Sequence, residues 1–110
     1  MAKYIRIPTI ETIVEHAKQG KYSWQKVSDF GNPALGAGGS FYEAYTRNGL
    51  RIKVKLGKVL LRSGGLEEEC EIAVCTPEYE CLLSYRCSPQ NQKKWDAVGM
   101  PLKEAIGHPR

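Results

Sequence analysis

The stretch FYEAYTRNGLRIKVKL, residues 41–56, decides the fold that the sequence predicts. Its centre, Asn48-Gly49, separates two runs in which apolar and polar residues alternate. Asn-Gly is the strongest short-range signal of a β-hairpin, because a two-residue type I′ turn needs φ > 0 at both central residues. The sequence therefore predicts a tight hairpin, and its cross-strand pairs are Arg47 with Leu50, Tyr45 with Ile52, Glu43 with Val54 and Phe41 with Leu56.

This register assigns every residue of the hairpin to one face of the sheet, because side chains alternate along a strand. The face that we expect to be buried holds Phe41, Glu43, Tyr45, Ile52, Val54 and Leu56. The opposite face holds Tyr42, Ala44, Thr46, Arg51, Lys53 and Lys55. Glu43 is then the one charged residue on the apolar face.

The alternation continues to residue 87 and predicts an antiparallel meander of four or five strands. Gly57 indicates a bulge or a bend, and Ser-Gly-Gly at residues 63–65 indicates a turn. Pro77 excludes a two-residue primed turn and favours a four-residue loop from Thr76 to Tyr79, built on a type I turn. In this register Cys75 pairs with Glu80, and Ile72 pairs with Leu83.

An amphipathic helix precedes the sheet. Thr9 is its expected N-cap and Gly20 its expected end. Its apolar stripe has helical spacing and is the natural partner of the apolar sheet face. The stripe of this helix consists of Ile10, Ile13, Val14 and Ala17. Before the helix, residues 4–7 resemble a short strand.

Three further segments complete the chain. Residues 21–30 are ambiguous between helix and strand, and their Trp24–Val27 spacing favours a short helix. Residues 31–40 hold four glycines and are expected to form a loop. Residues 90–98 are expected to be helical with Gly99 as the stop, and one further helical turn follows.

The chain is therefore expected to be a single α+β domain, residues 1–110. An N-terminal helix packs on a four- to five-stranded antiparallel meander sheet, and short C-terminal helices follow it. The composition is that of a globular protein, with 42% hydrophobic and 25% charged residues and a net charge of +4. The first residues lack the apolar run of a signal peptide, and no stretch has the length of a membrane span, so we expect a cytoplasmic protein without membrane contact.

The four cysteines predict neither disulfides nor a metal site. A chain without a signal peptide is expected to keep its thiols reduced. In the predicted register Cys81 and Cys87 lie on one face of a strand, about 20 Å apart, whereas Cys70 and Cys75 point to opposite faces. Because zinc needs all its ligands about 2 Å from one ion, we expect buried free thiols, no metal and no cofactor.

Glu43 is the candidate catalytic residue, because a carboxylate on an apolar face has a raised pKa and can act as a general base. The competing interpretation is an edge or bulge position that leaves Glu43 in water, since acidic residues are rarely buried. A basic row, Arg51, Lys53 and Lys55 with Arg47 nearby, could contact nucleic acid. An acidic row of Glu67, Glu69 and Glu71 offers a ladder of ion pairs instead.

The sequence contains no motif that identifies a reaction, and we interpret the chain as a small non-catalytic binding or adaptor domain. Its partner would be an unknown protein or small molecule, bound at the sheet face or beside the glycine-rich loop. Aromatic residues dominate binding energetics, and backbone amides of glycine loops can contact ligands. The candidate contacts are Trp24, Tyr42, Tyr45, Gly38 and Gly39.

Two alternatives remain open. The first is a nucleic-acid-binding protein or a metal-independent, ribonuclease-like enzyme, in which Glu43 acts as the base and Arg51 or Lys53 stabilises the phosphate. The second is an inhibitor protein encoded by a mobile element. A homodimer through an unprotected sheet edge is also compatible with the sequence.

Overall fold

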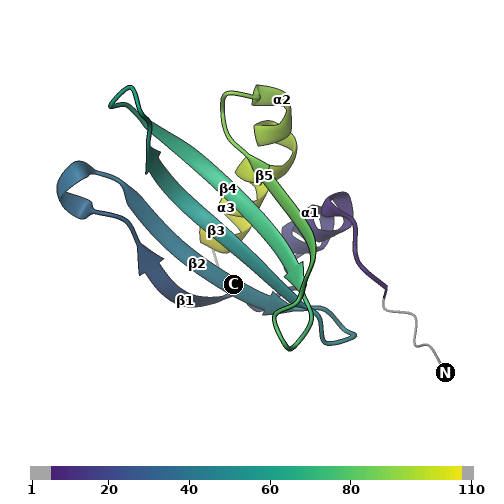
Figure 1. Ribbon diagram of the computed structural model, residues 1–110. Coiled ribbons are helices and arrows are strands. Elements are labelled where there is room, and N and C mark those ends of the chain that lie inside the picture. The colour runs from purple at the N-terminus through teal and green to yellow at the C-terminus, as the bar shows by residue number, and fades with distance from the viewer. Residues whose placement is uncertain (1–5, 108–110) are drawn as a thin grey trace.

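The computed structural model describes residues 6–107, which form a helical layer on one side of a single antiparallel sheet (Figure 1). The strands lie side by side in chain order, so the sheet is a five-stranded meander. The predicted α+β fold is confirmed, with its N-terminal helix and short C-terminal helices. The strands are β1 (Gln25–Phe30), β2 (Gly38–Tyr45), β3 (Arg51–Leu60), β4 (Leu66–Cys75) and β5 (Cys81–Cys87).

The N-terminal helix α1 (Ile10–Lys18) forms as the sequence predicts. The side chain of Thr9 accepts a hydrogen bond from the backbone N–H of Thr12 at 3.1 Å, so Thr9 is the N-cap. The apolar stripe of α1 points to the sheet, and α1 also packs against the C-terminal helix α3 (Met100–Gly107). The buried residues of α1 are Ile13, Val14 and Ala17.

The C-terminal helical segment runs through Gly99, so the predicted stop at Gly99 is wrong. It comprises α2 (Gln92–Lys94), a π-helical turn η2 (Trp95–Gly99) and α3. The ring of Trp95 lies directly on Gly99, where an added Cβ would stand 2.3 Å from a ring carbon. Glycine is therefore present here to admit the ring of Trp95 and not to end the helix. None of the helices within residues 6–107 has the length and apolar character to cross a membrane.

The core lies between the helices and one face of the sheet. Strands β3 and β4 contribute its centre, because their inward side chains are almost fully covered. The cluster includes Ile13, Val14, Ala17, Leu50, Ile52, Val54, Cys70, Ile72, Val74, Cys87, Trp95, Val98, Leu102 and Ile106. We call the face of the sheet that points away from α1, α2 and α3 the open face (Figure 1).

The β2–β3 hairpin forms, but its predicted turn type is wrong. The N–H of Thr46 donates to the carbonyl of Leu50 at 2.9 Å, and the N–H of Gly49 donates to the carbonyl of Thr46 at 3.1 Å. The loop therefore has three residues, and only the last of them, Gly49, has positive φ, at 85°. This is a type I turn followed by a left-handed residue, so Asn48 does not take the conformation that a type I′ turn requires.

The extra loop residue moves the pairing by one position, and this overturns the predicted faces of β2. Tyr45 pairs with Arg51 and Glu43 pairs with Lys53. Phe41, Glu43 and Tyr45 consequently lie on the open face with the basic row, whereas Tyr42 and Ala44 point to the helices. The predicted burial of Ile52 and Val54 is confirmed, at 0% and 1% exposure.

The β4–β5 hairpin also differs in register. Ile72 pairs with Tyr85 and not with Leu83, because Thr76 bonds to Glu80 across a three-residue loop and Leu82 is an extra residue in β5. The irregularity at Leu82 changes the face of the sheet to which the side chain of Cys81 points. Cys81 consequently shares the open face with Cys75, and the prediction that Cys81 and Cys87 lie on one face is wrong.

Three other predictions need correction. Residues 25–30 form strand β1 and not a helix, and Val27 is an extra residue in that strand. Strand β2 begins at Gly38, so the predicted loop at residues 31–40 ends earlier and contains a short 3-10 turn, η1 (Pro33–Leu35). Gly57 lies within the continuous strand β3 without a bulge. Of the strand predicted at residues 4–7, residues 4 and 5 lie outside the described residues, and Arg6 and Ile7 have no regular structure.

Candidate functional site

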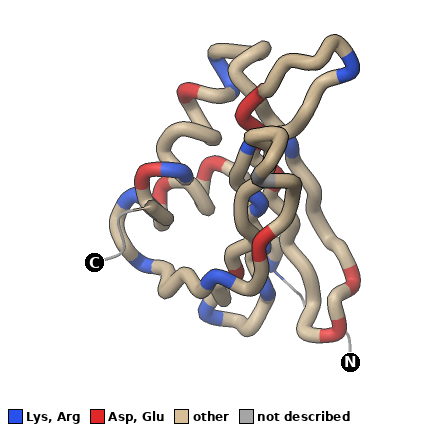
Figure 2. The backbone as a smooth tube through the Cα atoms, turned by 90° about the vertical axis from the view of Figure 1, so that its left-hand side faces the viewer, with Lys and Arg blue, Asp and Glu red and all other residues tan. Residues whose placement is uncertain are grey.

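The open face holds the best-organised group of polar and aromatic side chains among residues 6–107. Figure 2 shows the sheet from the side, with the helices on one side of it and acidic and basic residues interspersed along the chain. Arg51, in the first position of β3, is the centre of the group. We call Arg51 and its neighbours Glu43, Tyr45 and Tyr79 the Arg51 cluster.

Two residues of β2 hold the Arg51 guanidinium group. Its Nη1 donates to the carboxylate of Glu43 and, at 2.9 Å, to Tyr45 Oη. Tyr45 Oη in turn donates to Glu43 Oε1 at 3.0 Å, which closes a triangle of hydrogen bonds. The hydrogen bond to Glu43 raises the pKa of Arg51 and also the pKa of Tyr45. The cluster therefore keeps Arg51 charged and Tyr45 protonated.

The structure places Glu43 differently from both sequence-based interpretations. It lies on the open face and not on the apolar face, yet it is only 8% exposed because Arg51 and Tyr45 cover it. A carboxylate that accepts bonds from a guanidinium group and a phenol is committed to an ion pair. This arrangement suits Glu43 for positioning Arg51 rather than for accepting a proton from a substrate.

Tyr79 completes the cluster from the β4–β5 loop. The ring centroid of Tyr79 lies 4.4 Å from Cζ of Arg51 and 5.2 Å from Nζ of Lys53, within cation–π range of both. Arg51 also anchors the loop directly, because its Nε donates to the carbonyl of Pro77 at 3.2 Å. The ring of Tyr79 is nevertheless exposed to solvent, at 55% for the whole residue.

The backbone of Tyr79 is unusual. All three hairpin loops of β2 to β5 have three residues, and in each the last residue has positive φ: 85° at Gly49, 91° at Gly64 and 68° at Tyr79. Tyr79 is the one non-glycine residue with positive φ in the described part of the chain. A side chain in this conformation costs roughly 1–2 kcal/mol, which glycine avoids.

The remainder of the open face is a ladder of opposite charges. Lys55 forms an ion pair with Glu71 at 3.5 Å and lies over the ring of Phe30. Arg86 lies 3.1 Å from Glu71 and 3.7 Å from Glu69. The sequence-based ion-pair ladder is therefore present on this part of the face, whereas Arg51 takes its partner from β2.

The structure does not gather the other candidate contacts at one place. Tyr45 belongs to the Arg51 cluster, but Tyr42 points to the helices and packs on the core. Gly38 and Gly39 lie in β2, opposite Lys58 and Gly57, at the end of the sheet away from the cluster. Arg47 is an exposed residue of the β2–β3 loop. These residues stay candidate contacts without a shared site.

Trp24 lines a separate groove beside α1 and α3, with a volume of about 610 Å³. Its ring meets that of Tyr22 edge-on, with centroids 5.4 Å apart. Met100 and Pro101 also line this groove, as do the charged residues Lys18, Asp96 and Glu104. The groove therefore combines aromatic and apolar residues with charged residues of both signs, and it is distinct from the open face.

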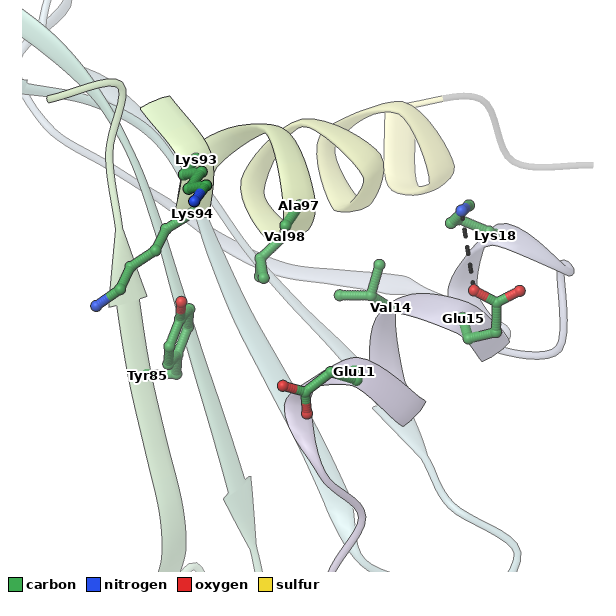
Figure 3. Close-up of a pocket in the computed structure, with 9 residues that line it drawn as sticks. All are labelled: Glu11, Val14, Glu15, Lys18, Tyr85, Lys93, Lys94, Ala97 and Val98. Carbon is green, nitrogen blue, oxygen red and sulfur yellow. Dashed lines mark ion pairs between the residues drawn. The ribbon is translucent and has the colours of Figure 1, made fainter. Parts of the chain in front are cut away.

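A second groove, of about 450 Å³, lies between α1, β5 and the C-terminal helices (Figure 3). Its apolar lining comes from Val14, Ala97 and Val98, and Tyr85 lines it from β5. Charged residues surround it, and of these Lys18 and Glu15 form an ion pair at 3.8 Å. Its charged residues are Glu11, Glu15, Lys18, Lys93 and Lys94.

Sequence reasoning missed Tyr79 and Phe30 as members of the open face. Pro77 could have indicated the position of Tyr79. Proline favours the second position of a type I turn, so Tyr79 occupies the fourth position, at the end of the loop. Within residues 6–107, no group of three or more His, Cys, Asp or Glu side chains is arranged to hold a metal ion. Comparison of the chain with models of known families, with curated proteins and with solved structures found no match.

Proposed function

We propose that the chain is a small non-catalytic binding domain that takes up a protein partner on the open face, centred on the Arg51 cluster. The main observation in support of this proposal is the conformation and exposure of Tyr79. Two of the three equivalent loop positions hold glycine, whereas the third holds a tyrosine in a costly conformation with its ring exposed. Residues held in unfavourable backbone conformations concentrate at functional sites. The ring is thus placed where a partner can reach it.

A protein partner suits the chemistry of the cluster. Tyrosine and arginine are the residue types most enriched among the side chains that dominate binding energy. Tyr45 and Tyr79 are exposed while Arg51 and Glu43 hold them in place, so little side-chain entropy remains to be lost on binding. We expect the partner to present an apolar side chain to the rings and an acidic group to Lys53.

Nucleic acid is the second candidate, and one observation favours it. The corrected register brings Phe41 and Tyr45 to the same face as Arg51, Lys53 and Lys55, and aromatic and basic residues together form platforms for single strands. The charges of the face argue against it. Arg51, Lys53, Lys55 and Arg86 share the open face with Glu43, Glu67, Glu69 and Glu71, so a phosphate backbone finds no continuous positive track.

A ribonuclease-like mechanism receives no support from these contacts. Glu43 is occupied by Arg51 and Tyr45, and His16 lies on α1, with its ring 6.0 Å from that of Tyr22 in the helical layer. His108 lies outside the described residues. An inhibitor protein encoded by a mobile element would be one form of the proposed binding domain, and this origin stays a prediction. The same holds for a homodimer through a sheet edge.

Photo-crosslinking tests the proposal. A photoreactive amino acid replaces Ser84, which is exposed on β5 at the open face, and in a second protein it replaces Lys93 beside the groove of Figure 3. In extracts of the cells that make the protein, we expect the open-face probe to give one discrete partner. The affinity of the purified partner should fall at least tenfold with Tyr79→Gly, a change that relieves backbone strain.

Two outcomes would oppose the proposal. In the first, the probe at position 93 captures the partner and Tyr79→Gly leaves its affinity unchanged. In the second, labelled single-stranded oligonucleotides bind with an affinity that falls steeply as salt rises and that Lys53→Glu weakens. The second outcome would establish the nucleic-acid alternative in its place.

A further inference from the structure

The four cysteines form two directly opposed pairs on neighbouring strands. Cys70 of β4 faces Cys87 of β5, and Cys75 faces Cys81. All four are free thiols. Opposed residues of antiparallel strands have Cβ atoms about 4.5–5.5 Å apart, whereas a disulfide needs about 3.5–4.5 Å. A small approach of the two strands therefore suffices to join either pair.

The two pairs differ in their access to solvent. Cys70 and Cys87 lie in the core at 0% and 5% exposure. Cys81 is exposed on the open face, and Cys75, at 5% exposure, lies directly opposite it. A reagent in solution can therefore reach one pair through Cys81, while the helices cover the other pair.

Local geometry also favours the outer pair. Thr76 and Glu80 are joined by a backbone hydrogen bond of 2.9 Å, so the next pair along the ladder, Cys75 and Cys81, is of the non-hydrogen-bonded kind. Side chains approach each other more closely in such pairs. The extra residue Leu82 is what turns Cys81 to the face of Cys75. The irregularity in β5 thus creates this pair.

The environments of the two thiols assign them different roles. Burial, followed by the proximity of Cys81, raises the pKa of Cys75. In the reduced protein Cys75 is therefore a weaker nucleophile than Cys81. The exposed Cys81 meets a reagent first, and Cys75 then lies behind it as the resolving thiol. In the core, the hydrogen bond with Cys87 and burial raise the pKa of Cys70.

We propose that Cys75 and Cys81 are a redox-active pair, which a low-molecular-weight disulfide such as glutathione disulfide converts to an intramolecular disulfide. The Cys81 thiolate attacks one sulfur of the reagent, forms a mixed disulfide and releases one glutathione. The Cys75 thiolate attacks the Cys81 sulfur and releases the second glutathione. The protein loses two protons and two electrons, and the reagent becomes two thiols.

The bond would join the two strands immediately below the loop that holds Tyr79. It would restrict the separation of β4 and β5 at that end of the sheet, and a thiol reductant would reverse it. This inference does not depend on the proposed function, because it rests on the pairing of β4 with β5 and on the exposure of Cys81 alone.

The test follows free thiols by mass spectrometry in the folded protein during incubation with glutathione disulfide. We expect loss of two thiols without a lasting glutathione adduct, and peptide mapping should join Cys75 to Cys81. Cys75→Ser should instead accumulate one stable adduct on Cys81, and Cys81→Ser should retain its remaining thiols. The inner pair is the internal control, and Cys87→Ala should leave formation of the outer bond unchanged.

Three results would overturn the proposal: a persistent adduct on Cys81 in the unsubstituted protein, a Cys70–Cys87 bond that forms at least as fast as the outer one, or no loss of thiols in the folded state. Circular dichroism of each variant distinguishes these results from unfolding. Cys75→Ser should form a stable glutathione adduct and Cys81→Ser should form none. If one of these variants does not fold, the other still tests the proposal.

Discussion

Cζ of Arg51 lies 4.4 Å from the ring centroid of Tyr79, whose backbone is held at a φ of 68°. The stacking recovers about 0.5–1 kcal/mol at an exposed site, which offsets only part of the roughly 1–2 kcal/mol that the left-handed conformation costs. The loop is thus less stable than a glycine in that position would make it.

Replacement of Tyr79 by glycine and by alanine separates these two contributions. Tyr79→Ala loses the stacking and keeps the strain, so we expect it to destabilise the fold by about 1 kcal/mol. Tyr79→Gly loses both, and we expect its free energy of unfolding to exceed that of the alanine variant by about 1 kcal/mol. Urea denaturation measures both. Gly64→Ala, in open space at a φ of 91°, is the matched control and should cost about 1 kcal/mol.

The ion pair of Arg51 with Glu43 should contribute more to the free energy of unfolding than the other ion pairs of the open face. The two side chains are 21% and 10% exposed, so Arg51→Met leaves a covered carboxylate with Tyr45 as its remaining partner. We expect a clear loss of stability, smaller than that for breaking a fully buried pair because Arg51 stays partly exposed. Lys55→Met, on the same strand and face, should cost about 0.5 kcal/mol because its pair is more exposed.

Addition of Glu43→Leu to Arg51→Met should recover at least half of the lost stability, since the variant then buries no unpaired charge. A double variant less stable than Arg51→Met alone would show that Glu43 contributes through contacts other than this pair. Thermal unfolding at one pH resolves the difference.

The pairing of Asp29 with Ser40 makes a prediction for pH. The hydroxyl of Ser40 donates to Asp29 Oδ1 at 2.6 Å, and this bond, with a further contribution from Lys26, lowers the pKa of Asp29. Because the folded pKa lies below the unfolded value of about 3.9, the stabilisation is present above that pH and is lost as pH falls through the folded pKa.

Ser40→Ala should therefore raise the pKa of Asp29 in an NMR titration and weaken the dependence of stability on pH in that window. An unchanged Asp29 titration would mean that β1 and β2 are not paired as described. Thr46→Ala, immediately after β2 and remote from Asp29, should leave that titration unchanged.

Gly99 tests the packing of the C-terminal helices. An added Cβ would stand 2.3 Å from the Trp95 ring, so Gly99→Ala must displace a large core side chain, and we expect a loss of about 2–3 kcal/mol. Gly107→Ala, in the same helical segment with nothing within 4 Å, should change stability by about 0.5 kcal/mol or less. Equal effects in thermal unfolding would contradict the contact between Trp95 and Gly99.

Much of the fold was predictable from local patterns. The helical stripe after Thr9, the alternation in residues 41–87 and the positions of the turns led to the observed class and layers. The errors arose where a single residue decides the outcome. The Asn48-Gly49 sequence is compatible with both a two-residue and a three-residue loop. The one additional loop residue moves Phe41, Glu43 and Tyr45 to the opposite face.

The sequence by itself determined which segments alternate and which side of α1 is apolar, because these properties depend on residue spacing along one chain. The tertiary structure alone decided the pairing of strands, since loop length and single-residue bulges set it and neither changes the alternation. It therefore also decided that Arg51 meets Tyr79, that Glu43 is covered on the open face and that Cys75 lies opposite Cys81. Residues far apart in sequence become neighbours only through that pairing.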